Sequence, residues 1–438
     1  MKKALCLILS VIMVLTFSIQ AFAEADSLNE VEKKMISAMD KIKDESFELS
    51  KQIWELKEMG MEEFKSSALL VETFKKHGFT VQHGVTAKDP LTGLDMELPT
   101  AFIATYEGKE GGPTIGITVE YDALPNGHAC GHNLISQSGF VAALGIKEAL
   151  QTIPGKVVVF GTPAEETLGG KIPMLAAGLM KDVDIAFSTH GSGGHQWSTE
   201  LNAKAMTWAR YETGALTFKG KSSHASASPE KGRSALDAAM LMGIGIEFLR
   251  EHMIETDRIH YIYMDGGKAA NVVPDSIKVD IYVRADTTPE LEELTKRVDN
   301  IIAGAALMTD TTAEYTWDAP FLNAVPVPRL WNFVADTAGL VGISKDKFLF
   351  NTKAGGSTDL GNVGYEMPTA NINFPIAEVE PGKEIASHTD EFREASIKEY
   401  AMKNSFIAGE IIALSAYKLL TNPTELQAIK DEFAMNKQ

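Results

Sequence analysis

The chain has 438 residues, 45% of them hydrophobic, and its 59 acidic side chains outnumber 41 basic ones, which gives a net charge of −18. This apolar content suffices for a packed core and excludes a disordered chain, and the acidic balance argues against a nucleic-acid binder. Because single cores stop growing at roughly 250–300 residues, the length predicts two domains.

Residues 1–23 have the pattern of a secretory signal peptide. Lys2 and Lys3 precede an apolar run from Ala4 to Ile19, and Ala21-Phe22-Ala23 is a small-x-small cleavage site. The alternative, a transmembrane anchor, needs a longer apolar run. We therefore expect an exported protein, periplasmic or extracellular, with no membrane attachment after cleavage. Cleavage would also remove Cys6 and leave Cys130 as the lone cysteine, which is then a buried hydrophobe, a free thiol or a metal ligand.

The elements that follow alternate between helix and strand. A helical pattern covers 27–77, and after it come strands at 79–82, 101–106 and 114–121, a helix at 134–150, a strand at 156–160, a helix at 169–179 and a strand at 183–188. This alternation predicts an α/β fold with a mostly parallel sheet flanked by helices.

The middle of the chain has a different order. A strand at 206–219 precedes a helix at 234–250, strands at 259–264 and 277–284, a helix at 289–307 and a strand at 312–316. The order β-α-β-β-α-β predicts an inserted ferredoxin-like α+β module. We place this module at 205–322, between two parts of the larger domain at 24–204 and 323–438, and expect a last helix at 397–420.

Residues of the types that can bind metals or move protons follow three successive predicted strands, and the carboxyl ends of parallel strands form one crevice. After the first strand, Cys130 and His132 flank a glycine that needs no Cβ, and thiolate with imidazole favours a transition metal. After the second strand come the adjacent carboxylates Glu165 and Glu166. One of them could bind a metal while the other moves protons. The alternative is that both belong to a solvated acidic turn. His190 follows the third strand. A lone histidine is usually structural, but the repetition at three strand ends favours a ligand.

Several longer motifs together carry a family resemblance. They are Glu120-Tyr-Asp-Ala-Leu-Pro, Gly127-His-Ala-Cys-Gly-His-Asn, Ala164-Glu-Glu, Phe218-Lys-Gly-Lys-Ser-Ser-His-Ala, Gly232-Arg-Ser-Ala-Leu-Asp-Ala, Asn271-Val-Val-Pro, Ala306-Leu-Met-Thr and Gly356-Ser-Thr-Asp-Leu-Gly. The chain resembles the aminoacylase and carboxypeptidase metallopeptidases that use a co-catalytic pair of metal ions. Within them it is most similar to the amidohydrolase branch, which includes p-aminobenzoyl-glutamate hydrolases and aminoacyl-lysine dipeptidases.

The resemblance implies a metal centre with assigned roles. Two divalent transition-metal ions, zinc or manganese with cobalt as a third candidate, would be held by Cys130, His132, Glu166, His190 and His388. Glu165 would be the general acid/base, and Asp122 would orient a ligand histidine. Most relatives outside this branch have an aspartate where Cys130 stands, so a thiolate is expected to bridge or flank the two ions.

The resemblance also gives the inserted module a role as a lid. His224 would contact the scissile carbonyl, often from the partner subunit, which implies a homodimer through the lid; without the resemblance, His224 could equally be a surface residue. Asn271 and Arg284 are candidate contacts for the substrate's carboxylate, and the alternative for Arg284 is a structural ion pair. Gly356 belongs to a loop that is expected to line the cleft.

We therefore expect an exported metal-dependent amidohydrolase that cleaves the amide bond of N-acyl or N-aminoacyl amino acids. Its partners would be small acyl-amino acids or dipeptides and no nucleic acid. The alternative is a non-catalytic protein that binds a metal or an acyl-amino acid on a degenerate hydrolase scaffold. Glu165 favours the enzyme, since a binding protein has no use for a second carboxylate that does not ligate the metal. A serine hydrolase lacks its Gly-x-Ser-x-Gly motif here, and no histidine is free to serve Cys130 as a base.

Overall fold

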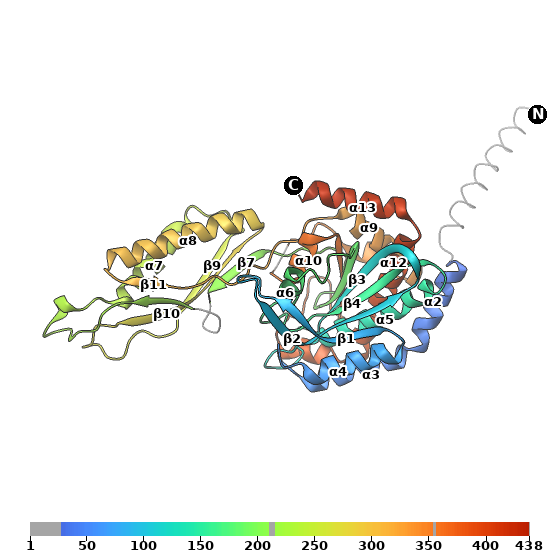
Figure 1. Ribbon diagram of the computed structural model, residues 1–438, viewed down its shortest axis with the longest axis horizontal. Coiled ribbons are helices and arrows are strands. Elements are labelled where there is room, and N and C mark those ends of the chain that lie inside the picture. Colours follow the sequence, from blue (N-terminus) through green and yellow to red (C-terminus); the bar gives the residue numbers. More distant parts are fainter. Residues whose placement is uncertain (1–27, 210–214, 354–355, 438) are drawn as a thin grey trace, which may run out of the picture.

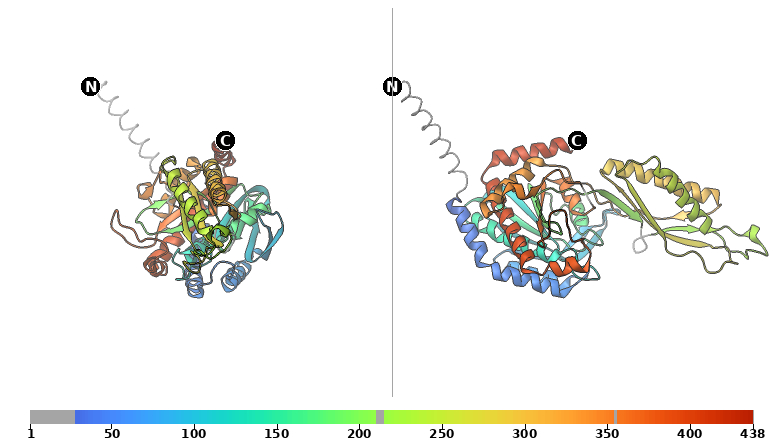
Figure 2. Two further views of the ribbon diagram at one scale, coloured as in Figure 1. Left: turned by 90° about the vertical axis from the view of Figure 1, so that its left-hand side faces the viewer. Right: turned by 180° about the vertical axis from the view of Figure 1, so that it is seen from behind.

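The computed structural model describes residues 28–209, 215–353 and 356–437, and the predicted signal peptide at 1–23 lies outside this range. The described chain forms two bodies, a larger domain and a lid domain that projects from it (Figure 1). Viewed along the long axis, the lid helices lie in front of the larger domain (Figure 2). Among the described residues, no helix combines the length and apolar character needed to cross a bilayer.

The larger domain is built on an eight-stranded sheet. In spatial order its strands are β1 (Thr80–Lys88), β2 (Asp95–Glu107), β4 (Pro154–Gly161), β3 (Lys109–Val119), β5 (Ile185–Ser192), β13 (Thr369–Pro375), β6 (Trp197–Ser198) and β12 (Phe348–Leu349). The central strands β4, β3, β5 and β13 are parallel, while β1 and β2 form an antiparallel edge. The predicted mostly parallel sheet is confirmed.

Helices cover both faces of this sheet because its central strands are apolar on both sides. On β4, Val157 and Val159 belong to the larger core, whereas Val158 and Phe160 belong to a second one. The larger core is covered by α2 (Glu30–Lys41), α3 (Lys43–Leu56), α4 (Phe64–Lys76), α5 (His132–Leu150), α9 (Pro328–Thr337) and α12 (Glu399–Leu420). The second core is covered by α6 (Lys171–Ala176) and α10 (Leu360–Glu366).

The lid domain has the predicted ferredoxin-like order. Its elements are β7 (Ala205–Ala209), β8 (Leu216–Lys219), α7 (Ala235–Arg250), β9 (Arg258–Tyr263), β10 (Ser276–Ala285), α8 (Thr288–Met308) and β11 (Thr312–Glu314). β10 pairs antiparallel with β7 and β8 on one side and with β9 on the other, and β11 pairs with β8. Buried and more exposed residues alternate strictly along β10. Val279, Ile281 and Val283 therefore pack into a core with α7 and α8, while Tyr282 and Arg284 lie on the opposite face.

Some elements differ from the sequence-based expectation. The helical pattern at 27–77 resolves into three helices, and α3 ends where Lys57 adopts a left-handed conformation with φ of 52°. The strand expected at 206–219 is two strands, β7 and β8, on either side of residues 210–214, which lie outside the described range. The helix ending at Leu420 is followed by a further one, α13 (Pro423–Asn436), whose Asn422 cap and proline at the first position are a recognisable start signal.

Candidate metal centre and active site

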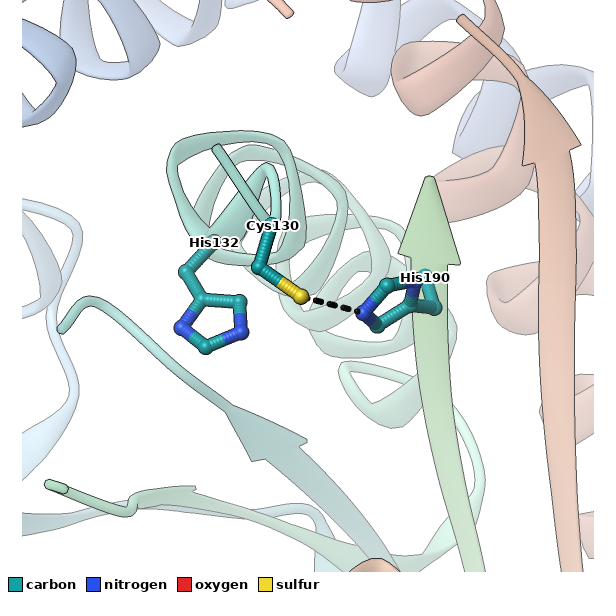
Figure 3. Close-up of side chains that lie close together, drawn as sticks. All are labelled: Cys130, His132 and His190. Carbon is teal, nitrogen blue, oxygen red and sulfur yellow. Dashed lines mark hydrogen bonds between the residues drawn. The ribbon is translucent and has the colours of Figure 1, made fainter. Parts of the chain in front are cut away.

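The first part of the site is the turn that enters α5. Gly131 caps this helix with φ of 80°, a conformation that costs a glycine little, and a Cβ there would lie 3.3 Å from the ring of Phe392. Cys130 and His132 therefore leave the turn toward the same space, where the Sγ of Cys130 lies 3.3 Å from Nε2 of His190 on β5 (Figure 3). Cys130 is 8% exposed and His132 is fully buried.

Asp122 connects this turn to the loop that follows β4. Its Oδ1 lies 2.8 Å from Nδ1 of His132, and its Oδ2 accepts a 3.0 Å hydrogen bond from the backbone N–H of Glu166. The contact to Nδ1 leaves Nε2 of His132 directed into the site. The position of Asp122 fits the orienting role that the resemblance implied.

The loop that carries Glu165 and Glu166 is fixed by the buried carboxylate of Glu63, which could not be recognised from the sequence. Ala164 has φ of 59°, which is unusual for a residue with a Cβ. Its N–H donates to Oε1 of Glu63, whose other oxygen accepts from the Thr100 hydroxyl. Burial raises the pKa of Glu63 to about 7, against the hydrogen bonds that favour its ionised form. Glu63 thus fixes the turn that presents the two adjacent glutamates.

His190 and His388 complete the predicted ligand set from two distant segments. Nδ1 of His190 donates to the carbonyl of Gly191 at 2.7 Å, so Nε2 faces Cys130. His388 has φ of 67°, and its N–H donates to the carbonyl of Ala129. Its Nε2 lies 3.4 Å from Oε1 of Glu166.

These side chains form two groups suited to hold metal ions. One consists of Cys130, His132 and His190, the other of Cys130, Glu166 and His388, and within each group the ligand atoms lie within 4.8 Å of one another. Nε2 of His132 and Oε1 of Glu166 are buried and make no hydrogen bond among the described residues, although each lies 3.3–3.4 Å from an atom of another candidate site residue. Buried polar atoms rarely lack a partner, and thiolate, imidazole and carboxylate are transition-metal ligands. The donor set therefore fits a pair of such ions that share Cys130.

Glu165 lies beside this set, and with His132 and Glu166 it forms a third cluster. Burial raises the pKa of Glu165 well above its usual range, and the neighbouring Glu120 and Asp359 raise it further. Burial would likewise raise the pKa of Glu166, but the adjoining His388 and His132 lower it to about 2. The pKa values of these adjacent carboxyl groups are therefore shifted in opposite directions. This suits Glu166 to metal ligation and Glu165 to proton transfer.

A buried cation sits within these carboxylates. The ammonium group of Lys171 is fully buried and donates to Glu120 at 2.7 Å and to Asp359 at 2.6 Å. Oε2 of Glu120 in turn lies 3.3 Å from Nε2 of His132. Lys171 could not be recognised from the sequence, because a lysine after Gly-Gly carries no signal of burial and only the folded chain brings Asp359 to it.

A cleft of about 890 Å³ lies between the two domains and is lined by the candidate metal ligands Cys130, Glu166, His190 and His388. Of the predicted substrate contacts, Arg284 and Gly356 line it, whereas His224 and Asn271 do not. At about 3.3 Å per residue, β10 spans roughly 26 Å from Arg284 to Ser276, and Ser276 pairs with Lys219 at the end of β8. His224 and Asn271 lie beyond that point, where His224 pairs with Val272. The structure thus does not bring His224 to the cleft of its own chain.

Comparisons with known proteins agree with this geometry. Residues 116–402 match the model of peptidase family M20/M25/M40. The chain is 32% identical to a mouse (Mus musculus) Xaa-Arg dipeptidase over 430 residues, 95% of each chain. It is 36% identical to one of the subunits of the p-aminobenzoyl-glutamate hydrolase of Escherichia coli over 309 residues, 65% of this chain and 60% of that protein. The fold resembles that of a dinuclear metal-binding M20 peptidase from Bacillus subtilis, with a TM-score of 0.63 and 18% identity over 87% of this chain and 99% of that one.

We predict that Lys171→Met destabilises the metal-free protein by about 3–5 kcal/mol, because it leaves Glu120 and Asp359 buried without their cation. Urea unfolding measures the loss. The exposed Lys181 is the matched control, and Lys181→Met should change stability by no more than about 0.5 kcal/mol. Equal effects of the two substitutions would contradict the role given to Lys171.

Proposed function

Because the chain belongs to peptidase family M20/M25/M40 and is thereby a hydrolase of amide bonds, we propose that it cleaves N-acyl or N-aminoacyl amino acids at a centre of two zinc or manganese ions. The relatives named for Xaa-Arg dipeptides and for p-aminobenzoyl-glutamate both split an amide between an acyl group and an amino acid, which supports this substrate class.

The observation that carries the proposal is the juxtaposition of the ligand set with a carboxyl group that is not needed to hold metal. The two ligand groups share Cys130, and Glu165 borders the cleft beside them. A protein that only bound a metal would have no use for Glu165.

The chain's own residues divide the chemistry. Divalent ions bound at the ligand set would act as Lewis acids toward the scissile carbonyl and make a water molecule more acidic. Asp122 holds His132 in the orientation that leaves Nε2 free. Glu165, whose pKa is raised by burial and by its acidic neighbours, takes up the proton of the attacking water and delivers it to the nitrogen of the leaving amine.

Arg284 is our candidate for binding the substrate's α-carboxylate. Its guanidinium lines the cleft and donates to the hydroxyl of Ser357 at 3.1 Å. It makes no ion pair with a carboxylate in the described parts of the chain, which argues against a purely structural role. Gly356 lies next to Ser357 on the same wall.

We propose that the lid domain forms a homodimer and delivers His224 to the cleft of the partner subunit. Met240, Ile244 and Phe248 follow one another at four-residue spacing along α7 and are 52%, 48% and 73% exposed. Such an apolar stripe is typical of a contact surface. Since His224 lies far from its own cleft, a partner's cleft is the place where it could act.

Export is part of the proposal, and the charged and apolar pattern of residues 1–23 supports it.

We predict that Glu165→Gln keeps its metal content but lowers kcat by about 10²–10⁴-fold, since it removes the group that carries the proton. Elemental analysis and hydrolysis of an N-acyl amino acid provide the two readouts. Glu166→Gln is the matched comparison at the adjacent position, and it should lose metal. Wild-type activity in Glu165→Gln would show that the roles of the two glutamates are assigned wrongly.

For the lid, we predict that His224→Ala lowers kcat by about 10²–10³-fold without loss of metal, the usual cost of removing one donor to a developing oxyanion. Mixing His224→Ala chains with Glu165→Gln chains should restore part of the activity, because the heterodimer holds one cleft with both residues intact. Full activity of His224→Ala alone, or heterodimers without activity, would contradict a role across the subunit interface.

A further inference from the structure

The lid side of the cleft carries a group of basic side chains on one face of the lid sheet. Arg258 and His260 project from β9 and Arg284 from β10, and all three line the cleft opposite Glu120, Glu165 and Glu166. We call Arg258, His260 and Arg284 the basic wall. Its presence is notable in a chain whose net charge is −18, because acidic partners are abundant elsewhere on the protein.

The basic wall places two like charges side by side, and neither of them contacts a carboxylate of the described chain directly. Arg258 and Arg284 are direct partners across the antiparallel pair β9–β10, so their side chains share one face. Like charges placed directly opposite are destabilising. Neither forms an ion pair within residues 28–209, 215–353 and 356–437; Arg284 donates to the Ser357 hydroxyl and Arg258 to backbone carbonyls. In contrast, Lys204 on the same side of the cleft pairs with Asp286 at 2.9 Å.

A second, smaller cavity indicates how a substrate would be oriented. It has a volume of about 200 Å³. Polar residues of the site line one part of it, and the larger side chains Met206, Trp208, Tyr282 and Phe321 line the rest. A volume of roughly 150 Å³ is enough for a group the size of benzene, and the aromatic part of the lining offers such a group an apolar contact. Arg284 borders both cavities. An apolar acyl group in the small cavity would leave the amino-acid half of the substrate in the larger one, against the basic wall.

We propose that the basic wall binds two carboxylates of the leaving amino acid, so that the enzyme selects acyl derivatives of a dicarboxylic amino acid. This inference rests on the proposed function. Arg284 takes the α-carboxylate, and Arg258 with His260 takes the side-chain carboxylate. A guanidinium forms two parallel hydrogen bonds to a carboxylate, and a pair of anions removes the repulsion between the two arginines. A cationic leaving residue such as arginine or lysine would meet that repulsion instead.

The test compares three substrates that differ only at the end of the side chain: N-benzoyl-glutamate, N-benzoyl-glutamine and Nα-benzoyl-lysine. For the metal-loaded full chain we expect kcat/KM to fall by about 10–100-fold from glutamate to glutamine, which is nearly isosteric, and further for lysine. Arg258→Gln should lower kcat/KM for the glutamate substrate by a similar factor and leave the glutamine substrate within about twofold. Arg258→Glu should favour the lysine substrate.

Arg297→Gln is the matched control, because Arg297 is a half-buried arginine on α8 of the same domain that does not line the cleft and donates to the carbonyl of His252. It should leave the ratio between substrates unchanged. Equal kcat/KM for the glutamate and glutamine substrates, or an equal loss on all three substrates in Arg258→Gln, would overturn the inference while the proposed function stands.

A protein that holds its metals but hydrolyses neither these three substrates nor the corresponding dipeptides would contradict the proposed function instead. Calorimetric titration of Glu165→Gln with N-benzoyl-glutamate and N-benzoyl-glutamine then still decides the inference without turnover. A Kd for N-benzoyl-glutamate at least about tenfold lower than that for N-benzoyl-glutamine supports the role of the basic wall, and equal Kd values overturn it.

Discussion

The carboxylate of Asp122 is the interaction on which the rest of the site depends. One of its oxygens fixes the ring of His132 at the start of α5, and the other holds the backbone of Glu166 after β4. Asp122 thereby fixes the distance between the loops that follow β3 and β4. Nε2 of His132 and the carboxylate of Glu166 then face the same space. Because Asp122 is 1% exposed, water does not compete for these contacts. His190 needs no such link, since β5 itself carries it to the same edge of the sheet.

The concentration of negative charge that results explains the other unusual features of the site. Glu120, Glu165, Glu166 and Asp359 lie around one cleft end, and their mutual repulsion has to be offset by cations. Lys171 supplies one cation from within the chain, and the buried atoms of His132 and Glu166 that make no hydrogen bond within the described residues face the place where metal ions fit. The basic wall adds positive charge on the opposite side of the cleft. The cleft thus has carboxylates on one side and basic side chains on the other. A substrate whose amide lies at the metal site and whose carboxylates lie against the lid would match this arrangement.

Much of this arrangement could be predicted from the sequence, because local signals mark the ends of strands. The turn around Gly131 and the adjacent pair Glu165–Glu166 each follow an apolar strand, and parallel strands bring such ends together. Glu63 and Lys171 could not be predicted, since their roles come from burial against Thr100, Ala164 and Asp359, which only the tertiary fold supplies. The position of His224 away from its own cleft could not be predicted from the sequence either. Its loop follows β8 as expected, but the length of the lid strands carries it away from its own cleft.

Metal stoichiometry tests most directly the central claim that Cys130 and the ligand groups it shares would hold two ions. Elemental analysis of the chain, loaded with zinc or manganese and freed of excess ions, should give close to two ions per chain for the wild type. Cys130→Ser should hold clearly fewer, since both ligand groups contain the thiol. A wild-type protein that retains no metal, or a Cys130→Ser protein that still holds two ions as tightly as the wild type, would contradict the account.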